Sequence, residues 1–405
     1  MSGEVMAKDK VAILTAGGMA PCISATIGRL IKKYTEIVPD TEIIGYLNGY
    51  KGLLLGNYIS IPQSVRNSAE LLYNFGGSVF GNSRVRLTNI ADCVKKGYVK
   101  KGENPLQVAA EQLMKDGVTI LYTIGGDDTN IAAAELADYL ALTGYILIVV
   151  GIPKTVDNDV EPIHQSLGAW TAAEQGAIFF ENIANENTTS SRQLIIHEVM
   201  GRYCGWLTAT TAYEYRKRLN KKTFLPDILL AKERWDIDAV YIPEIPLNIN
   251  KELERLNRLM DEKDNVNIFL SEGAGIETIV AEMESKGEEI RRDAFGHVRI
   301  DEINPGQWFA GKFSKLLKAE KDLVQKSGYF ARSAAPNKRD LDLIFQTADM
   351  ALEAALNGQS GVIGMDEDNN NKISVINFSR IKGGKPFDTN QKWFQEMMSE
   401  IGQIR

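Results

Sequence analysis

Short apolar runs rich in β-branched residues alternate along the chain with longer stretches whose apolar positions recur every three or four residues. The first pattern is typical of buried strands and the second of amphipathic helices. The runs predict strands at residues 11–16, 41–47, 119–124, 146–152, 194–199, 239–242, 267–270 and 372–378. The amphipathic stretches predict helices at residues 24–34, 105–115, 129–141, 167–186 and 251–261.

Strands that alternate with crossover helices predict an α/β fold with doubly wound, mostly parallel sheets. Ligands of such sheets bind beyond the carboxyl ends of the strands. Three of the predicted strands end in glycines or in charged residues, which are AGG at 16–18, GGDD at 125–128 and IPKTVD at 152–157. We therefore expect the active site where these three ends meet.

The composition argues against a nucleic-acid-binding, membrane-spanning or disulfide-linked protein. The 405 residues hold 46 Lys and Arg against 53 Asp and Glu, a net charge of −7, which argues against unspecific binding to nucleic acid. The longest strongly apolar run, residues 145–153, is far shorter than the roughly 20 residues of a membrane helix. The first residues contain no apolar signal core, and Cys22, Cys93 and Cys204 form no Cys-x-x-Cys pair. We expect a cytoplasmic protein without disulfides, structural zinc or membrane partners.

The segment GGDDT at 125–129 follows a predicted strand and opens a predicted helix. Its glycines allow a ligand to approach the backbone, and the N–H groups of a helix N-terminus favour an anion. A carboxylate beside phosphate oxygens is repulsive unless a cation lies between them, so Asp127 is a candidate Mg²⁺ ligand. The alternative is an ordinary acidic helix cap.

The segment PKTVDND at 153–159 places a cation, a hydroxyl and two carboxylates just beyond another predicted strand. A carboxylate such as Asp157 can accept a proton from an attacking alcohol, while Lys154 can hold a transferring phosphate. The alternative is a polar turn that begins at Pro153.

Six motifs in order make the chain resemble the phosphofructokinase family, and specifically its pyrophosphate-dependent branch. They are LTAGG at 14–18, GGDDT at 125–129, PKTVDND at 153–159, MGRYCGW at 200–206, SEGA at 271–274 and GYFARS at 328–333. The resemblance implies the phosphofructokinase fold of two Rossmann-like lobes. Residues 1–165 with about 333–380 would bind the phosphoryl donor and Mg²⁺, and residues 166–332 with about 381–405 the sugar phosphate. It also implies a homo-oligomer, with a homodimer favoured.

The implied reaction is reversible transfer of a phosphoryl group from pyrophosphate to the 1-hydroxyl of fructose 6-phosphate. By position in the motifs, Gly18, Gly126 and Arg84 would contact the donor, and Asp157 would be the base. The remaining positions implied to bind the sugar phosphate are Thr155, Val156, Met200, Gly201, Arg202, Glu272, Tyr329, Phe330, Ala331 and Arg332. Arg332 would pair with the 6-phosphate through a bidentate fork. The same resemblance places the loop that carries Tyr50 near the donor.

The choice of donor depends on Asp128 and Lys154, where ATP-using relatives typically have glycine. The carboxylate of Asp128 would repel the α-phosphate of a nucleotide, and Lys154 would pair with pyrophosphate. The alternatives are an ATP-dependent 6-phosphofructokinase and a non-catalytic, sugar-phosphate-binding regulatory subunit.

Two positions depart from the expected motifs. Gln193 stands where many members of the family carry an arginine that reaches a neighbouring subunit, and Arg192 lies one residue earlier. Residues 306–313 match the GxxxxGK pattern of a phosphate-binding loop. However, Phe313 stands where that motif has serine or threonine, and no strand is predicted before residue 306. We interpret this segment as having no phosphate-binding role.

Overall fold

The computed structural model describes residues 9–291 and 303–403 and divides the chain into two compact units. Unit 1 contains the described residues up to Thr171 together with Arg332–Lys385. Unit 2 contains the described part of Ala172–Ala331 together with the residues from Pro386 onward. No helix in the described residues is long and apolar enough to cross a membrane.

Unit 1 is built on a seven-stranded sheet with the order β12-β11-β5-β4-β1-β2-β3. The strands are β1 (Lys10–Thr15), β2 (Glu42–Tyr46), β3 (Tyr58–Ser60), β4 (Ile120–Gly125), β5 (Ile148–Pro153), β11 (Gly361–Asp366) and β12 (Lys372–Ile376). Five of them run in parallel, and β3 and β12 are antiparallel edge strands. A separate two-stranded ribbon pairs β6 (Val160–Glu161) with β13 (Lys382–Gly383).

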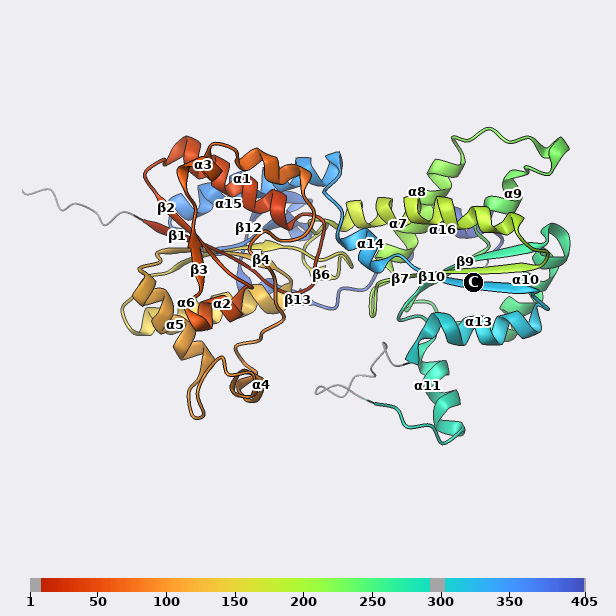
Figure 1. Cartoon of the computed structure of the whole chain (residues 1–405), viewed down its shortest axis with the longest axis horizontal. Helices are drawn as coiled ribbons and strands as arrows, with labels where there is room; N and C mark the ends of the chain where they lie inside the picture. The colour runs from red at the N-terminus through yellow and green to blue at the C-terminus, as the bar shows by residue number, and fades with distance from the viewer. Residues whose placement is uncertain (1–8, 292–302, 404–405) are drawn as a thin grey trace, which may run out of the picture. The chain divides into compact units, whose positions relative to one another are not determined.

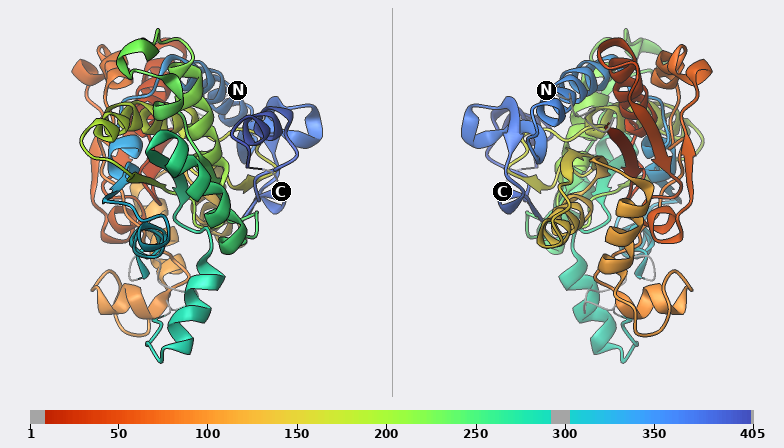
Figure 2. Two further views of the ribbon diagram at one scale, coloured as in Figure 1. Left: turned by 90° about the vertical axis from the view of Figure 1, so that its right-hand side faces the viewer. Right: turned by 90° about the vertical axis from the view of Figure 1, so that its left-hand side faces the viewer.

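Helices cover both faces of the unit 1 sheet (Figure 1). The helices of this unit are α1 (Ile23–Ile37), α2 (Tyr50–Leu55), α3 (Gln63–Arg66), α4 (Ile90–Lys95), α5 (Pro105–Asp116), α6 (Asp127–Leu142) and α15 (Lys338–Leu356). On the face covered by α1 and α15, the hydroxyls of Tyr34 and Tyr122 lie 2.9 Å apart and share a buried hydrogen bond. These elements can be followed by colour from two further sides in Figure 2.

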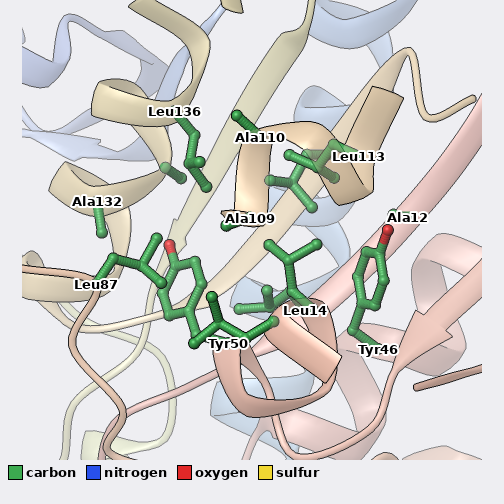
Figure 3. Packing of buried hydrophobic residues seen from close by; sticks show 14 of the residues in the cluster. Ala12, Leu14, Tyr46, Tyr50, Leu87, Ala109, Ala110, Leu113, Ala132 and Leu136 are labelled. Atoms are coloured by element: carbon green, nitrogen blue, oxygen red, sulfur yellow. The ribbon is translucent and has the colours of Figure 1, made fainter. Parts of the chain in front are cut away.

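The opposite face packs against α2, α5 and α6 in a continuous apolar cluster (Figure 3). Tyr50 lies in this cluster beside Leu14 and Ala109, and its hydroxyl donates to the carbonyl of Thr129 over 2.6 Å. The ring is almost completely buried. Tyr50 is therefore a core residue that supports the start of α6, although the resemblance places its loop near the donor.

Unit 2 is built on a four-stranded parallel sheet with the order β10-β7-β9-β8. The strands are β7 (Gln193–Val199), β8 (Ala239–Tyr241), β9 (Asn265–Ser271) and β10 (Lys321–Lys326). The helices are α8 (Trp206–Leu219), α9 (Lys232–Trp235), α10 (Ile249–Lys263), α11 (Ile276–Ser285), α13 (Pro305–Leu316) and α16 (Lys392–Glu400). Two further helices, α7 (Ala169–Ile183) and α14 (Gly328–Arg332), contain two of the points where the chain passes between the units, and the third lies between Lys385 and Pro386.

The unit 2 sheet is also covered on both faces (Figure 1). One face packs against α10 and α13 through Leu256, Met260 and Phe309. On the other face, Phe180 of α7 packs edge-on against Tyr215 of α8 and Phe269 of β9, with ring centroids 4.8 and 4.6 Å away. Strands β7, β8 and β9 are thus buried on both sides, whereas the edge strand β10 is partly exposed.

Side chains near the end of the chain complete the β8 edge of this sheet. The amide of Gln403 accepts a hydrogen bond from the N–H of Val240 over 2.8 Å and donates to its carbonyl over 3.2 Å. Nearby, Arg216 is buried and forms a bidentate pair with Asp236, with distances of 2.8 and 2.9 Å. The guanidinium also pairs with Glu400 of α16. Arg216 is thus a buried residue, although residues 213–236 around it are rich in lysine and arginine.

The structure confirms the predicted strands and helices with small shifts at their ends. It adds five strands that the apolar pattern did not indicate, which are β3, β6, β10, β11 and β13. β10 reads KDLVQK and lies at the edge of its sheet, so its solvent-facing residues interrupt the apolar run. The predicted helix at 167–186 instead ends at Ile183 and continues as a 3₁₀ turn.

Candidate functional site

In unit 1, the loop after β1 and the loop that carries Arg84 lie against each other. The N–H of Gly17 donates to the carbonyl of Ser83 over 3.0 Å, and the amide of Asn82 donates to the carbonyl of Gly17 over 2.7 Å. Gly17 has a φ of +88°, a conformation that strongly favours glycine. A methyl group on Gly18 would lie 3.7 Å from Nη2 of Arg84. The sequence-predicted residues Gly18 and Arg84 are therefore neighbours.

Lys154, the residue after β5, connects the end of β5 to the loop that carries Gly17 and Gly18. Its N–H donates to the carbonyl of Gly125 over 2.9 Å, and its ammonium donates to the carbonyl of Gly18. The side chain is only 2 % exposed. Burial lowers the pKa of Lys154 to about 8, and the nearby Arg84 acts in the same direction. A buried ammonium with one carbonyl partner is well placed to be stabilised by an incoming anion.

The N-terminus of α6 opens toward these loops. Its N-cap is Gly126, which has an ordinary φ of −75°, and a side chain there would meet nothing within 4 Å. Asp128 pairs with Nη2 of Arg86 over 2.5 Å. Burial and the neighbouring Asp127 raise the pKa of Asp128, and Arg86 opposes that shift. Asp128 is thus held in place by a cation that the motif analysis did not single out.

The loop that follows β5 is fixed by its own hydrogen bonds. Asn158 has a φ of +55°, and its side chain accepts from the N–H of Ser166 over 2.7 Å and donates to the carbonyl of His164 over 3.1 Å. The hydroxyl of Thr155 accepts from the N–H of Asp157 over 3.2 Å. Val156 is buried. This network holds Asp157 on a rigid turn.

The carboxylates of Asp127 and Asp159 lie close enough to repel each other. The hydroxyl of Thr155 donates to Asp159 over 3.1 Å, and this bond acts to lower the pKa of Asp159. Burial raises that pKa by more, and Asp127 adds to the rise. A divalent cation between the two carboxylates would relieve this repulsion. Asp159 is a candidate that the sequence reasoning left unassigned.

The donor set fits Mg²⁺ held partly by a substrate. No group of three or more His, Cys, Asp or Glu side chains that could hold a metal is found in the part of the chain that the structure describes. Mg²⁺ in phosphoryl-transfer sites characteristically uses one or two carboxylates together with water and substrate phosphates. Asp127 and Asp159 supply carboxylate oxygens of the type that Mg²⁺ prefers. We call the loops that carry Gly17, Gly18, Arg84, Arg86, Gly126–Asp128 and 154–159 the unit 1 site.

In unit 2, the predicted sugar-phosphate residues follow two neighbouring strands. Val199, the last residue of β7, lies in register with Ser271, the last residue of β9. The N–H of Glu272 donates to the carbonyl of Val199 over 2.9 Å, and the hydroxyl of Ser271 donates to the carbonyl of Gly201 over 2.5 Å. The structure therefore brings Gly201 and Glu272 together. Burial raises the pKa of Glu272, and Arg202 counteracts this effect.

Two glycines make this close approach possible. Gly201 has a φ of +128°, and a methyl group on it would lie 2.4 Å from the carbonyl oxygen of Cys204. A methyl group on Gly273 would lie 1.8 Å from the carbonyl oxygen of Arg202. The backbones after β7 and β9 therefore touch in a way that no other residue type would permit.

The third strand end of unit 2 carries α14. The N–H of Ser327 donates to the carbonyl of Glu198, and its hydroxyl lies 2.8 Å from Nε2 of the buried His197. Tyr329 is 79 % exposed and Phe330 is 49 % exposed, whereas Ala331 is buried. We call Met200–Arg202, Glu272 and 328–331 the unit 2 site. Arg332, which completes the motif, is the first residue of the return to unit 1.

The two departures from the motifs have structural explanations. Gln193 is buried in β7, and the guanidinium of Arg192 binds the carbonyl of Leu317 over 2.6 Å and Asp261 over 2.6 Å. Arg192 therefore caps the C-terminal end of α13. The GxxxxGK-like segment lies inside α13, and the N–H of Gly306 donates to the carboxylate of Glu198 over 2.9 Å. A side chain of the protein already occupies the place of an anion there.

With these two sites described, the class of protein follows from both fold and sequence. The sequence profile described as Phosphofructokinase matches residues 10–300, which is most of the chain. The chain belongs to the phosphofructokinase family. A solved structure described as a pyrophosphate-dependent phosphofructokinase from Nitrosospira multiformis covers 96 % of this chain and 92 % of its own, with a TM-score of 0.68 and 17 % identity. That identity supports the fold alone.

Two curated relatives are much closer in sequence. The chain is 60 % identical over 394 residues to the "Pyrophosphate--fructose 6-phosphate 1-phosphotransferase" of Methylomonas methanica, covering 97 % of this chain and 96 % of the relative. It is 57 % identical over 396 residues to the protein of the same name from Methylotuvimicrobium alcaliphilum, covering 98 % and 97 %. The chain is thus similar over its length to proteins named for a pyrophosphate donor.

Proposed function

We propose that the chain transfers a phosphoryl group reversibly from pyrophosphate to the 1-hydroxyl of fructose 6-phosphate. The products are fructose 1,6-bisphosphate and orthophosphate. The bond between the bridging oxygen and the transferred phosphorus of pyrophosphate breaks as the bond to the sugar oxygen forms. Such a transfer depends on positioning and electrostatic stabilisation, so it needs no covalent enzyme intermediate.

The observation that carries the choice of donor is the pair of charged residues in the unit 1 site. The ammonium of Lys154 lies at the glycine loop, and Arg86 holds the carboxylate of Asp128 at the start of α6. Lys154 would bind the small, highly charged pyrophosphate, and Asp128 would repel the additional phosphate of a nucleotide. Gly18, Gly126 and Arg84 would contribute backbone approach and positive charge to the same donor.

Mg²⁺ would be held by Asp127 together with Asp159 and the donor oxygens, and it would neutralise negative charge on the transferring phosphate. Asp157 would accept the proton of the sugar hydroxyl, because its turn is fixed by Thr155 and, of the two carboxylates in the loop after β5, it is the one assigned no metal role. The backbone of Val156 and the hydroxyl of Thr155 would line the same end of the site.

The unit 2 site is proposed to bind fructose 6-phosphate. Met200, Gly201, Arg202 and Glu272 are brought together at adjacent strand ends, where parallel sheets commonly bind ligands. The exposed Tyr329 and Phe330 offer contact area on α14. Arg332 is proposed to pair with the 6-phosphate. We accordingly assign the phosphoryl donor to unit 1 and the sugar phosphate to unit 2.

The test is to measure fructose 1,6-bisphosphate formation from fructose 6-phosphate and Mg²⁺ with either pyrophosphate or ATP. We expect turnover with pyrophosphate and at least a hundredfold lower kcat/KM with ATP. Turnover with ATP alone would overturn the donor argument and favour an ATP-dependent 6-phosphofructokinase. No turnover with either donor, together with fructose 6-phosphate binding, would favour a regulatory subunit. The homodimer and the cytoplasmic location remain predictions, which light scattering and cell fractionation would test.

A further inference from the structure

The ribbon of β6 and β13 lies against the unit 1 site, although β13 follows Asp159, the last residue of that site, by more than 200 residues. Gly383 pairs with Val160 of β6 in antiparallel register. A methyl group built on Gly383 would lie 2.1 Å from Oδ2 and 2.7 Å from Cγ of Asp127. The backbone of β13 is therefore in direct contact with the carboxylate that we assign to Mg²⁺.

Packing is what fixes the carboxylate of Asp127. Within residues 9–291 and 303–403, this carboxylate makes no hydrogen bond and no ion pair, and its charged neighbours Asp128 and Asp159 repel it. An isolated carboxylate on a short side chain would otherwise exchange between the staggered χ1 rotamers that the helix allows. The contact with Gly383 removes part of that freedom.

Hydrogen bonds and an ion pair of Lys385 fix the ribbon of β6 and β13 to the neighbouring segments of unit 1. The N–H of Lys385 donates to the carbonyl of Asp159 over 2.9 Å. The ammonium of Lys385 donates to the carbonyl of Ile163 and pairs with Glu367 over 3.0 Å. Beneath the ribbon, Val160 and Ile163 belong to a small buried apolar cluster that also contains Val362, Ile376 and Ile381.

We propose that Gly383 is a positioning residue of the donor site, where its bare backbone holds the carboxylate of Asp127 in the orientation that receives the metal–pyrophosphate complex. This inference rests on the proposed function, because it requires Asp127 to be a metal ligand. A methyl group at residue 383 needs about 1 Å more room, and turning Asp127 is the easiest way to provide it. The fold would survive while the metal ligand moves.

The test measures metal binding directly as well as activity. Mn²⁺ is titrated into the full chain with methylenediphosphonate, a pyrophosphate analogue that cannot transfer a phosphoryl group, and bound Mn²⁺ is read by electron paramagnetic resonance. We expect Gly383→Ala to weaken Mn²⁺ binding by about 10- to 100-fold. The Mg²⁺ concentration for half-maximal rate should rise by the same factor, and the affinity for fructose 6-phosphate should not change.

Gly361→Ala is the matched control. Its methyl group would also be crowded, 2.6 Å from Cγ1 of Val375 and 2.8 Å from the carbonyl oxygen of Ile376, but in β11 of the same unit and against no site residue. We expect it to lower the melting temperature without changing Mn²⁺ affinity. Equal losses of Mn²⁺ affinity in both variants would assign the effect to general destabilisation and overturn the proposal.

Asp127→Asn separates this inference from the proposed function. If Asp127→Asn binds Mn²⁺ normally, Asp127 is not a metal ligand, and both its proposed metal role and the role of Gly383 fail, while the donor assay still decides the proposed reaction. If Asp127→Asn loses Mn²⁺ binding while Gly383→Ala keeps it, only the role of Gly383 is overturned. Should Gly383→Ala not fold, Lys385→Met loosens the ribbon without adding atoms beside Asp127. We expect it to weaken Mn²⁺ binding several-fold, and unchanged binding would overturn the proposal.

Discussion

The unit 1 and unit 2 sites, which we propose bind two different phosphorylated ligands, are built differently. The unit 1 site is built from charges that other groups hold, such as the buried Lys154 against the glycine loop and Asp128 against Arg86. The unit 2 site is built from touching backbones at Gly201 and Gly273 and presents the exposed ring of Tyr329. The first arrangement suits a small anion of high charge, and the second suits a larger ligand with a carbon skeleton.

The largest effect is expected where the two ligands react. Asp157→Asn removes the proposed base but keeps the size of the side chain, so we expect kcat to fall by roughly 10²- to 10⁴-fold. The KM values for both substrates should change little, because the turn is held by Thr155 and Asn158. Steady-state kinetics in both directions would test this, and near-normal turnover would rule out Asp157 as the base.

Removing the buried ammonium should affect the donor alone. Lys154→Met is expected to raise the KM for pyrophosphate by about 100-fold, since a hydrogen-bonded charge in a buried site is lost. The KM for fructose 6-phosphate should stay within twofold. A parallel loss of both affinities would show that Lys154 supports the whole fold instead of the donor.

The pKa of Lys154 also predicts a pH dependence with a definite sign. The pKa is lowered to about 8, so the ammonium is charged below pH 8 and loses its proton as the pH rises through that value. In the wild-type chain, the KM for pyrophosphate should therefore rise above pH 8, approaching tenfold per pH unit. In Lys154→Met this rise should be absent. A wild-type KM that is constant from pH 7 to 9.5 would contradict the assignment.

Selectivity between donors should respond to Asp128. Asp128→Gly removes the carboxylate that would repel a nucleotide, and we expect kcat/KM for ATP to rise by about 10- to 100-fold. The gain is smaller than full repulsion would give, because Arg86 partly neutralises Asp128 and both side chains are about half exposed. Competition between the two donors measures it. If a well-folded variant gains no ATP activity, the repulsion argument is wrong.

The smallest effect is expected on the exposed side of the unit 2 site. Tyr329→Ala should raise the KM for fructose 6-phosphate about three- to tenfold and leave the melting temperature unchanged, because the ring is largely exposed. Phe330→Ala is the comparison, since its ring lies 5.7 Å from that of Phe179 and its loss should also reduce stability. An unchanged KM for fructose 6-phosphate in Tyr329→Ala would show that the ring of Tyr329 does not contact the sugar phosphate.

Sequence reasoning identified the elements whose chemistry is local. Gly18, Asp127 and Lys154 lie just beyond apolar strands, so the place where parallel strands end could be predicted for them. Glu272 was assigned only through the resemblance to the family. Strand β11 was missed although its interior is apolar, because glycines at 361 and 364 interrupt the run. The glycines are accommodated because Val375 and Ile163 fill the space that their side chains would need.

Contacts between distant segments could not be predicted. The sequence shows that Lys154 is a cation but does not show that its side chain is buried, which is what lowers its pKa. Arg86 has no motif of its own, and its pairing with Asp128 depends on how the loop after β3 returns to the sheet. Gly383 carries no signal at all, because its importance lies in the space that Asp127 occupies.

The side chain of Gln403 has a practical consequence for handling the protein. Its amide forms hydrogen bonds with both the N–H and the carbonyl of Val240. It therefore satisfies backbone groups at the edge of β8 that a neighbouring strand would otherwise pair with. Unprotected strand edges recruit other chains and seed aggregates. We therefore expect truncation before residue 403, or fusion of a bulky purification tag directly after it, to increase the insoluble fraction on expression. A tag at the N-terminus should not have this effect.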